Sequence, residues 1–265
     1  MKISIVTANY NGERFIEQTL KSVISQRDDG VELEYIVIDG KSTDRSMEII
    51  NKYKAQIDRI ICEKDSGAFD AINKGLALAT GDVLGWLNAD DLYEPGALKR
   101  VLEVMAGNPD CSLCFGHCPI MDEQGVEIRQ GITRFKEFFY KYSSRFTIQC
   151  INYISQPAML FRRSAFEKAG GLRQDFTCAW DYDLIIKLFR QGRAVMVGNP
   201  PLAYFRWHPS SLSGTLFRDQ FREEWTVAAR DAGRFSLQAL IHLGVWWGIV
   251  FCYTLMKWMR RDEKK

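Results

Sequence analysis

Short apolar runs alternate with longer amphipathic segments along the first hundred residues of the chain. The apolar runs predict four strands, at Ile3–Ala8, Glu34–Ile38, Arg59–Cys62 and Val83–Leu87. The segments between them repeat apolar residues at helical spacing and predict four helices, at Glu13–Gln26, Thr43–Tyr53, Ala68–Ala79 and Pro95–Met105. Strands that alternate with helices form a mostly parallel sheet with helices on both faces. The pattern therefore predicts an α/β fold with an open, Rossmann-like sheet.

Polar side chains follow each predicted strand, and Ser42 or Thr43 is expected to cap the second helix. The four clusters are Thr7, Asn9 and Asn11; Asp39, Ser42, Thr43 and Asp44; Glu63, Asp65 and Ser66; and Asn88, Asp90 and Asp91. Any one cluster is ordinary turn chemistry. In parallel sheets, however, ligands bind at the carboxyl ends of the strands. Four oxygen-rich clusters at one edge therefore favour a polar ligand site that could hold a metal.

The densest cluster ends the segment "VLGWLNADD", where Asn88, Asp90 and Asp91 close an apolar strand. Neighbouring carboxylates repel each other, and burying one of them unpaired is costly. Two aspartates shortly before Pro95-Gly96 are also good turn and helix-start chemistry. A bound divalent cation is the other interpretation, because Mg²⁺ takes one or two carboxylates together with substrate oxygens.

Composition limits the class of protein. The 265 residues, 46% hydrophobic and 26% charged, can bury one large core. The net charge of +2 is too close to neutral to predict nucleic-acid binding. The first residues do not have the pattern of a signal peptide, and the chain has seven cysteines, an odd number. Both observations fit a reducing compartment, so we expect a cytoplasmic protein.

Two motifs match known phosphate-binding or metal-binding motifs only in part. "DGKST" (Asp39–Thr43) looks like the end of a phosphate-binding loop, but Tyr35 occupies the position of its first glycine. "CSLCFGHC" (Cys111–Cys118) has the spacing of metal ligands within a segment that reads as a strand, where cysteine is an ordinary core residue. We expect core packing there.

Four segments, taken in order, resemble the family-2 glycosyltransferases of the GT-A fold. They are "ISIVTANYNGERFIEQTLKSVISQ", "YIVIDGKSTDRS", "EKDSGAFDAINKGLALATGDVLGWLNADD" and "WDYDLIIKLFRQG", within residues 1–210. The resemblance implies a GT-A catalytic domain over residues 1–215 and an inverting transferase. It also implies a nucleotide-sugar donor, most often a UDP-sugar, with Mg²⁺ or Mn²⁺ as cofactor. Bacterial members commonly build cell-surface polysaccharides or glycolipids on polyprenyl-linked acceptors.

The resemblance also assigns roles by position. Asp181 in "WDYDL" matches the general base, and Asp90 and Asp91 match the metal-binding acids. Donor binding is implied for Thr7, Asn9 and Asp39 at the base and ribose, for Asp65, Asp70 and Lys74 along the pocket, for Asn88, and for Arg206 and His208 in a late loop. The chain departs from the usual pattern at three positions, where Asn88 replaces an aspartate, Ile72 an arginine and Trp180 an acid.

Two other functions stay open from the sequence. A nucleotidyltransferase that makes nucleotide sugars would need a glycine-rich basic loop after the first strand, and "TANYNGERF" offers one glycine and one arginine. A non-catalytic nucleotide-sugar-binding protein would not need Asp90, Asp91 and Asp181.

Residues 216–265 are predicted to form a helical tail. Within it, the 22 residues "FSLQALIHLGVWWGIVFCYTLM" (235–256) have no formal charge and could span a bilayer. A spanning helix would carry the basic residues after it across the membrane, against the positive-inside tendency. We therefore expect a helix on the inner leaflet, with Trp246, Trp247, Tyr253 and Trp258 at the interface. The alternative is a helix packed on the core.

Overall fold

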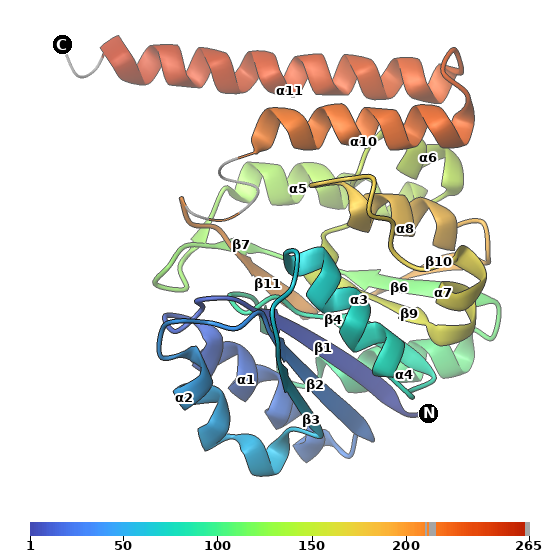
Figure 1. Ribbon diagram of the computed structural model, residues 1–265. Coiled ribbons are helices and arrows are strands. Elements are labelled where there is room, and N and C mark those ends of the chain that lie inside the picture. Colours follow the sequence, from blue (N-terminus) through green and yellow to red (C-terminus); the bar gives the residue numbers. More distant parts are fainter. Residues whose placement is uncertain (210, 212–215, 263–265) are drawn as a thin grey trace.

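The computed structural model describes residues 1–209, 211 and 216–262, without the side chains of 217, 218 and 250–262. Its centre is a seven-stranded sheet with strand order β10-β6-β9-β4-β1-β2-β3 (Figure 1). The strands are β1 (Ile3–Asn9), β2 (Leu33–Asp39), β3 (Arg59–Cys62), β4 (Val83–Trp86), β6 (Cys111–Gly116), β9 (Met159–Arg162) and β10 (Arg193–Val197). Strands β1 to β4, β6 and β10 run parallel, whereas β9 runs antiparallel to β4 and β6. The predicted mostly parallel sheet is confirmed.

Helices cover both faces of this sheet, also as predicted. On one face α1 (Ile16–Ile24), α2 (Ser46–Lys52) and α4 (Ala97–Gly107) pack on β1, β2 and β4. On the other face α3 (Ala68–Leu78), α7 (Arg163–Ala169) and α8 (Trp180–Leu188) pack on the same strands and on β9. Burial on both sides explains why β1, β2, β4 and β6 are buried at every residue and mostly apolar. Short 3₁₀ turns lie at Ser25–Asp29, Lys54–Gln56, Tyr140–Tyr142 (η3) and Gln156–Ala158 (η4).

A small second sheet lies next to the end of β4 and has the order β5-β11-β7-β8. Its strands are β5 (Leu92–Tyr93), β11 (Ala203–Arg206), β7 (Ile120–Met121) and β8 (Glu127–Ile128). Strand β11 pairs antiparallel with β5, which directly follows the Asn88–Asp91 segment. The second sheet thereby brings a late part of the chain to the carboxyl end of β4.

Four further helices form a layer at one end of the molecule, away from α1 and α2 (Figure 1). They are α5 (Gln130–Phe138), α6 (Arg145–Cys150), α10 (Phe217–Ala232) and α11 (Leu237–Asp262). The carboxylate of Asp231 in α10 is bonded to Arg145 and Gln149 of α6. In α11, His242 lies 2% exposed, with Nδ1 3.0 Å from the Gln149 carbonyl oxygen. Within the described residues, no helix combines enough length and apolar character to cross a bilayer.

Three predicted helix starts are wrong. The first helix begins at Ile16 rather than Glu13. The fourth helix begins at Ala97 rather than Pro95, because Gly96 adopts a left-handed conformation (φ 71°) directly before it. The second helix begins at Ser46, and the Asp44 carboxylate accepts its N–H group at 2.9 Å. The expected cap, Ser42, instead donates its hydroxyl to Asp39 at 2.6 Å.

Candidate active site

The two aspartates after β4 have different surroundings. Asp91 is completely buried, and its carboxylate accepts hydrogen bonds from the Arg206 backbone N–H at 2.9 Å and from Asn88 Nδ2 at 3.1 Å. Burial, together with the neighbouring Asp90, raises the pKa of Asp91 well above its usual range. Since both Asp91 oxygens bond to the protein, this side chain holds the segment in shape.

Asp90 points towards His208 instead. Its Oδ2 lies 2.9 Å from His208 Nε2, and both side chains are partly exposed. His208 follows β11, so this pair joins segments separated by more than a hundred residues. A carboxylate next to an imidazole is a donor set that suits Mn²⁺ and accommodates Mg²⁺. Among the described residues no group of three or more His, Cys, Asp or Glu side chains is placed to hold a metal, so water or substrate oxygens would complete the coordination.

Arg206 lies beneath this pair, with 1% of its surface exposed. Its guanidinium donates to the carbonyl oxygens of Asp90 (2.8 Å), Asp122 (3.2 Å) and Glu123 (3.1 Å), and to Gln18 Oε1 (2.8 Å). The resemblance implied a loop residue at the diphosphate. The structure places Arg206 at the end of β11, where it holds the backbone of the Asp90 segment.

Asn9 and Asp39 form a buried polar pair at the ends of β1 and β2. Asn9 Nδ2 donates to Asp39 Oδ2 at 2.7 Å, and the backbone N–H of Ser42 donates to Asp39 Oδ1 at 2.8 Å. Asn9 Oδ1 is buried without a hydrogen-bond partner among the described residues. Thr7 lies two residues before Asn9 in β1 and is completely buried, with its hydroxyl 3.0 Å from that of Tyr35. Thr7 therefore lies inside the core below the sheet edge.

Asp65, Asp70 and Lys74 lie beyond the end of β3. Lys74 Nζ forms ion pairs with Glu63 at 2.8 Å and with Asp70 at 3.3 Å. Asp65 accepts the Gly67 N–H at 2.9 Å, and a side chain at Gly40 would come within 2.6 Å of its other oxygen. The predicted donor residues thus form two groups at the carboxyl ends of the strands. One group follows β1 to β3, and the other follows β4 and β11.

Asp181 lies in the first turn of α8. Its side chain is partly buried, and Oδ1 accepts the Tyr182 N–H at 2.7 Å. Burial and the nearby Glu224 carboxylate raise the pKa of Asp181 to about 7. The preceding Trp180 packs on Trp86 of β4 at 5.5 Å between ring centroids. This contact attaches the start of α8 to the strand that leads into Asn88–Asp91. Asp183 forms an ion pair with Lys187 at 2.6 Å.

Three acceptors that support these residues were missed from the sequence. The Glu223 carboxylate of α10 accepts the backbone N–H groups of Thr177 (3.1 Å), Cys178 (2.7 Å) and Ala179 (3.0 Å), directly before α8. Glu224, which is buried, accepts a hydrogen bond from Asn152 at 3.1 Å. Gln156 Oε1 accepts a bond from Asn88 at 3.2 Å. For the two glutamates, the only sequence signal is that they are adjacent acids in a charged helix. That signal does not distinguish a buried acid from an exposed one.

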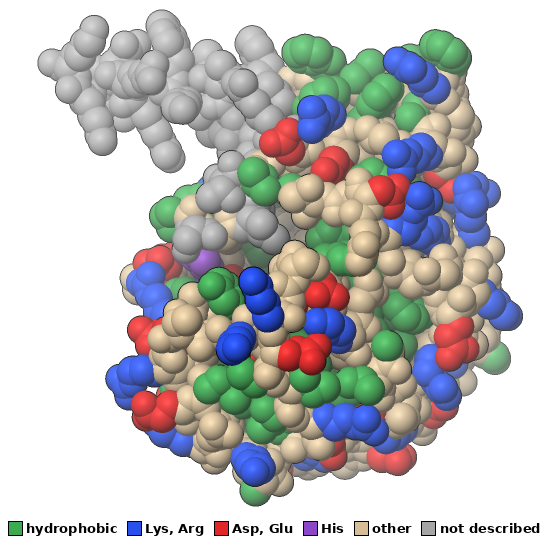
Figure 2. Space-filling view, in the orientation of Figure 1, with side chains coloured by type: hydrophobic (Ala, Val, Ile, Leu, Met, Phe, Trp, Pro, Cys, Tyr) green, Lys and Arg blue, Asp and Glu red, His purple; other side chains and the backbone are tan. Residues whose placement is uncertain are grey.

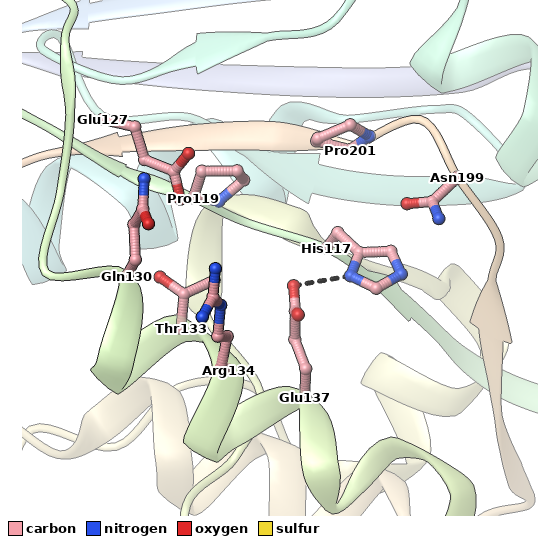
Figure 3. Close-up of a pocket in the computed structure, with 9 residues that line it drawn as sticks. All are labelled: His117, Pro119, Glu127, Gln130, Thr133, Arg134, Glu137, Asn199 and Pro201. Carbon is pink, nitrogen blue, oxygen red and sulfur yellow. Dashed lines mark hydrogen bonds and ion pairs between the residues drawn. The ribbon is translucent and has the colours of Figure 1, made fainter.

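A pocket of about 290 Å³ lies beyond the end of β6, outside this constellation (Figure 3). On one wall His117 Nδ1 lies 2.6 Å from Glu137 Oε1 of α5, and the other lining residues are Pro119, Glu127, Gln130, Thr133, Arg134, Asn199 and Pro201. The lining includes none of the predicted site residues. Cys111 and Cys114 are buried in β6 with their sulfur atoms 3.6 Å apart, in agreement with the expected core packing.

A family model described as "Glycosyl transferase family 2" matches residues 4–170 of the chain. An uncharacterized glycosyltransferase of Nostoc sp. is 34% identical over 137 residues, which are 51% of this chain and 42% of the relative. The putative teichuronic acid biosynthesis glycosyltransferase TuaG of Bacillus subtilis is 32% identical over 133 residues, 49% of this chain and 52% of the relative. The match thus spans about half the length of these relatives, or less.

Solved structures share the fold at low sequence identity. TarS 1–349 of S. aureus in complex with UDP-GlcNAc has a TM-score of 0.69 and 17% identity, and the match covers 91% of this chain and 69% of that one. The mannosyltransferase PcManGT from Pyrobaculum calidifontis, in complex with GDP-Man and Mn²⁺, has a TM-score of 0.65 and 20% identity, covering 87% and 64%. These similarities establish the GT-A type of fold.

Proposed function

The chain belongs to glycosyl transferase family 2, and we propose that it moves a sugar, with inversion, from a UDP-sugar to a hydroxyl group of a saccharide acceptor. The observation that carries this proposal is the partly buried carboxyl group of Asp181 at the start of α8, with a pKa of about 7. A base with this pKa is about half deprotonated at neutral pH and still binds a proton well, which is what general-base catalysis needs.

In the proposed reaction the acceptor oxygen attacks the anomeric carbon from the face opposite the diphosphate. The proton of the acceptor hydroxyl passes to the Asp181 carboxylate as the new glycosidic bond forms. The bond between the anomeric carbon and the diphosphate breaks, and the nucleoside diphosphate leaves with the electron pair. Attack from the opposite face inverts the configuration. Glu223 supports this step as a positioning residue, because it fixes the backbone just before Asp181.

For the donor, we propose that Asn9 and Asp39 approach the nucleoside, and that Asp65, Asp70 and Lys74 line the path between nucleoside and sugar. Asp90 and His208 are the side chains that would hold Mg²⁺ or Mn²⁺, while Asp91, Asn88 and Arg206 keep their segment in place. The bound cation would neutralise charge on the leaving diphosphate. TarS with UDP-GlcNAc and PcManGT with Mn²⁺ support this choice of donor and metal.

We further propose that the acceptor is lipid-linked and that the protein works at the cytoplasmic face of the membrane, in surface polysaccharide or glycolipid assembly. The names of two relatives, a teichuronic acid glycosyltransferase and an O-antigen biosynthesis protein of Myxococcus xanthus, support the polysaccharide context. The exposed face of α11 supports the proposed membrane location. Its exposed apolar residues recur at helical spacing and are Leu237, Leu240, Ile241 and Trp247. Figure 2 shows hydrophobic side chains gathered over the described part of this helix. Tyr253 and Trp258 lie outside the described side chains.

A panel of UDP-, GDP- and dTDP-sugars, each incubated with the full chain and Mn²⁺, tests the proposed function through the nucleoside diphosphate released. We expect UDP release from at least one UDP-sugar, faster with a polyprenyl-linked acceptor, and a matching loss in Asp181→Asn. Donor binding without release would indicate a non-catalytic protein. Pyrophosphate release from a nucleoside triphosphate and a sugar phosphate would indicate a nucleotidyltransferase.

A further inference from the structure

The layer of helices at the α11 end carries a second unusual surface, on α5, η3 and α6. Seven exposed residues lie along this segment, as adjacent pairs or single residues about three positions apart, and we call them the outward stripe: Arg134, Phe135, Phe138, Lys141, Tyr142, Arg145 and Phe146. The four aromatic side chains are 47–54% exposed. Large aromatic groups seldom gather on the surface of a soluble domain unless they bind something.

Four members of the outward stripe contact one another, either directly or through the ring of Phe139. The ring centroids of Phe138 and Tyr142 are 5.7 Å apart, and Lys141 Nζ lies 4.9 Å and 4.7 Å from these two rings. Phe135 and Phe138 each contact the ring of Phe139, at 5.4 Å and 5.3 Å. These contacts join Phe135, Phe138, Lys141 and Tyr142 into one cluster of three rings and a cation, with Phe139 as the link to Phe135.

Charge is strongly biased along the same segment. Residues 129–146, "RQGITRFKEFFYKYSSRF", contain five basic residues and one acid, whereas the whole chain is nearly neutral. The acid, Glu137, is bonded to His117 in the pocket, whose lining also includes Arg134 of the stripe. The stripe itself combines three cations with four aromatic rings. Arg145 is paired with the Asp231 carboxylate of α10 at 3.1 Å, so Arg134 and Lys141 are the cations that remain for an anionic partner. This composition is typical of segments that lie at the interface of an anionic bilayer.

We propose that the outward stripe is a second membrane-docking surface, which binds anionic phospholipid headgroups through its cations and buries its rings at the interface. The proposal rests on the proposed function, in which the enzyme meets a lipid-linked acceptor. The stripe lies beside α11, since His242 and Gln238 of α11 both bond to Gln149 of α6. Two separate contacts fix the orientation of a protein on a membrane, which one helix cannot do.

The position of α6 relates this orientation to catalysis. Tyr182, the residue after Asp181, donates its hydroxyl to the Ile148 carbonyl oxygen of α6 at 2.6 Å. Phe146 is two residues earlier on the same helix. A membrane bound by the stripe is therefore connected, through one short helix, to the segment that carries the proposed base.

Vesicle co-sedimentation of the full chain tests the proposal, with phosphatidylcholine vesicles that contain or lack phosphatidylglycerol. The variants are Lys141→Glu and the double variant Phe138→Ser/Tyr142→Ser, with α11 intact. We expect the first to weaken partition onto the anionic vesicles about fivefold or more, since each cation contributes about 1 kcal/mol near such a surface. We expect the double variant to lose at least about tenfold on both vesicle types.

Matched controls are Lys99→Glu on α4 and Val126→Ser, which change an exposed cation and an exposed apolar side chain elsewhere. Both should keep wild-type partition. Unchanged partition of the stripe variants would overturn the proposal. So would a shift from dimer to monomer, by light scattering, without a change in vesicle binding, because the stripe would then bind a second copy. UDP release in the absence of membranes reports separately on the proposed function and should be the same in all four variants.

Discussion

Adjacent aspartates after β4 perform different tasks because one is buried and the other is not. Asp91 accepts two hydrogen bonds inside the protein, whereas Asp90 is partly exposed and faces His208. The repulsion expected between two carboxylates is reduced because burial favours the protonated form of Asp91. The segment is therefore both a structural turn and a candidate metal-binding element, the two interpretations that the sequence had presented as alternatives.

Substitution of each aspartate by alanine separates the two tasks. Asp90→Ala should remove the Mn²⁺-dependent part of donor affinity and leave stability near that of the wild type. Asp91→Ala should lower the free energy of unfolding by about 1–3 kcal/mol, because the buried Arg206 N–H loses its acceptor. Calorimetry with and without Mn²⁺ and urea unfolding measure the two effects, and His208→Ala should match Asp90→Ala. If Asp90→Ala left metal-dependent binding intact, the metal assignment would be wrong.

The pKa of Asp181 predicts how the activity depends on pH. A base must be deprotonated, so kcat/KM should rise with pH up to about 7 and then level off. Asp181→Asn should keep donor affinity and lower kcat by at least about 10²-fold. Asp183→Asn, in the same turn of α8, is the control and should retain most activity. The assignment fails if the two variants lose activity equally.

The raised pKa of Asp181 also predicts how the stability of the fold changes with pH. Since the folded state raises the pKa of Asp181, it binds the proton more tightly than the unfolded chain does. The wild type should therefore lose stability as pH rises from about 4 to about 7, whereas Asp181→Asn has no proton to lose. At pH 8 the variant should unfold at a higher temperature than the wild type, and the difference should shrink towards pH 4.

At the scale of elements, the proposed base is positioned by a helix that lies more than thirty residues later in the chain. Glu223 of α10 accepts three backbone N–H groups at the start of α8, where such groups have no partner within the helix itself. We therefore propose that the catalytic unit extends through α10, beyond the boundary at residue 215 expected from the sequence.

Removal of this acceptor should disturb catalysis more than binding. Glu223→Ala should lower kcat about tenfold or more while leaving the donor KM nearly unchanged, because only the position of Asp181 is altered. Glu223→Gln retains an acceptor oxygen and should recover part of the loss. Asp219→Ala, an exposed acid on the same helix paired with Arg222, should have little effect. A parallel rise in KM and fall in kcat would show that Glu223 supports the fold in general.

The sequence predicted elements whose partners are near in the chain and missed those that depend on distant ones. Strands β1 to β4 alternate with α1 to α4, so their apolar periodicity was enough to predict the parallel sheet. The antiparallel strand β9 and the two-residue strands β5 and β7 have no comparable signal. Arg206 shows the same limit at the site, because its burial depends on Gln18, Asp90, Asp122 and Glu123 together.

At the scale of the whole molecule, α11 has two faces with different partners. Its inner face packs on α6 and α8, where His242 bonds to the Gln149 carbonyl oxygen and its ring lies 5.8 Å from that of Tyr182. Its outer face presents Leu240 and Trp247, which are 54% and 62% exposed. The sequence predicts a helix on the inner leaflet, with packing on the core as the alternative. The described part of α11 packs on the core with one face and is free to meet a membrane with the other.

The two faces predict opposite effects for substitutions only a few residues apart. Leu240→Ser/Trp247→Ser should reduce co-sedimentation with anionic vesicles about tenfold or more and leave the unfolding temperature nearly unchanged, since the two side chains contribute mainly to the outer surface. His242→Ala should keep vesicle binding and lower the unfolding temperature by several degrees, because it removes a buried ring and a hydrogen bond. It should also lower kcat, since His242 packs on the residue after Asp181. If the outer-face variant lost stability and kept its vesicle binding, α11 would be a core helix alone, and membrane attachment would have to come from the outward stripe.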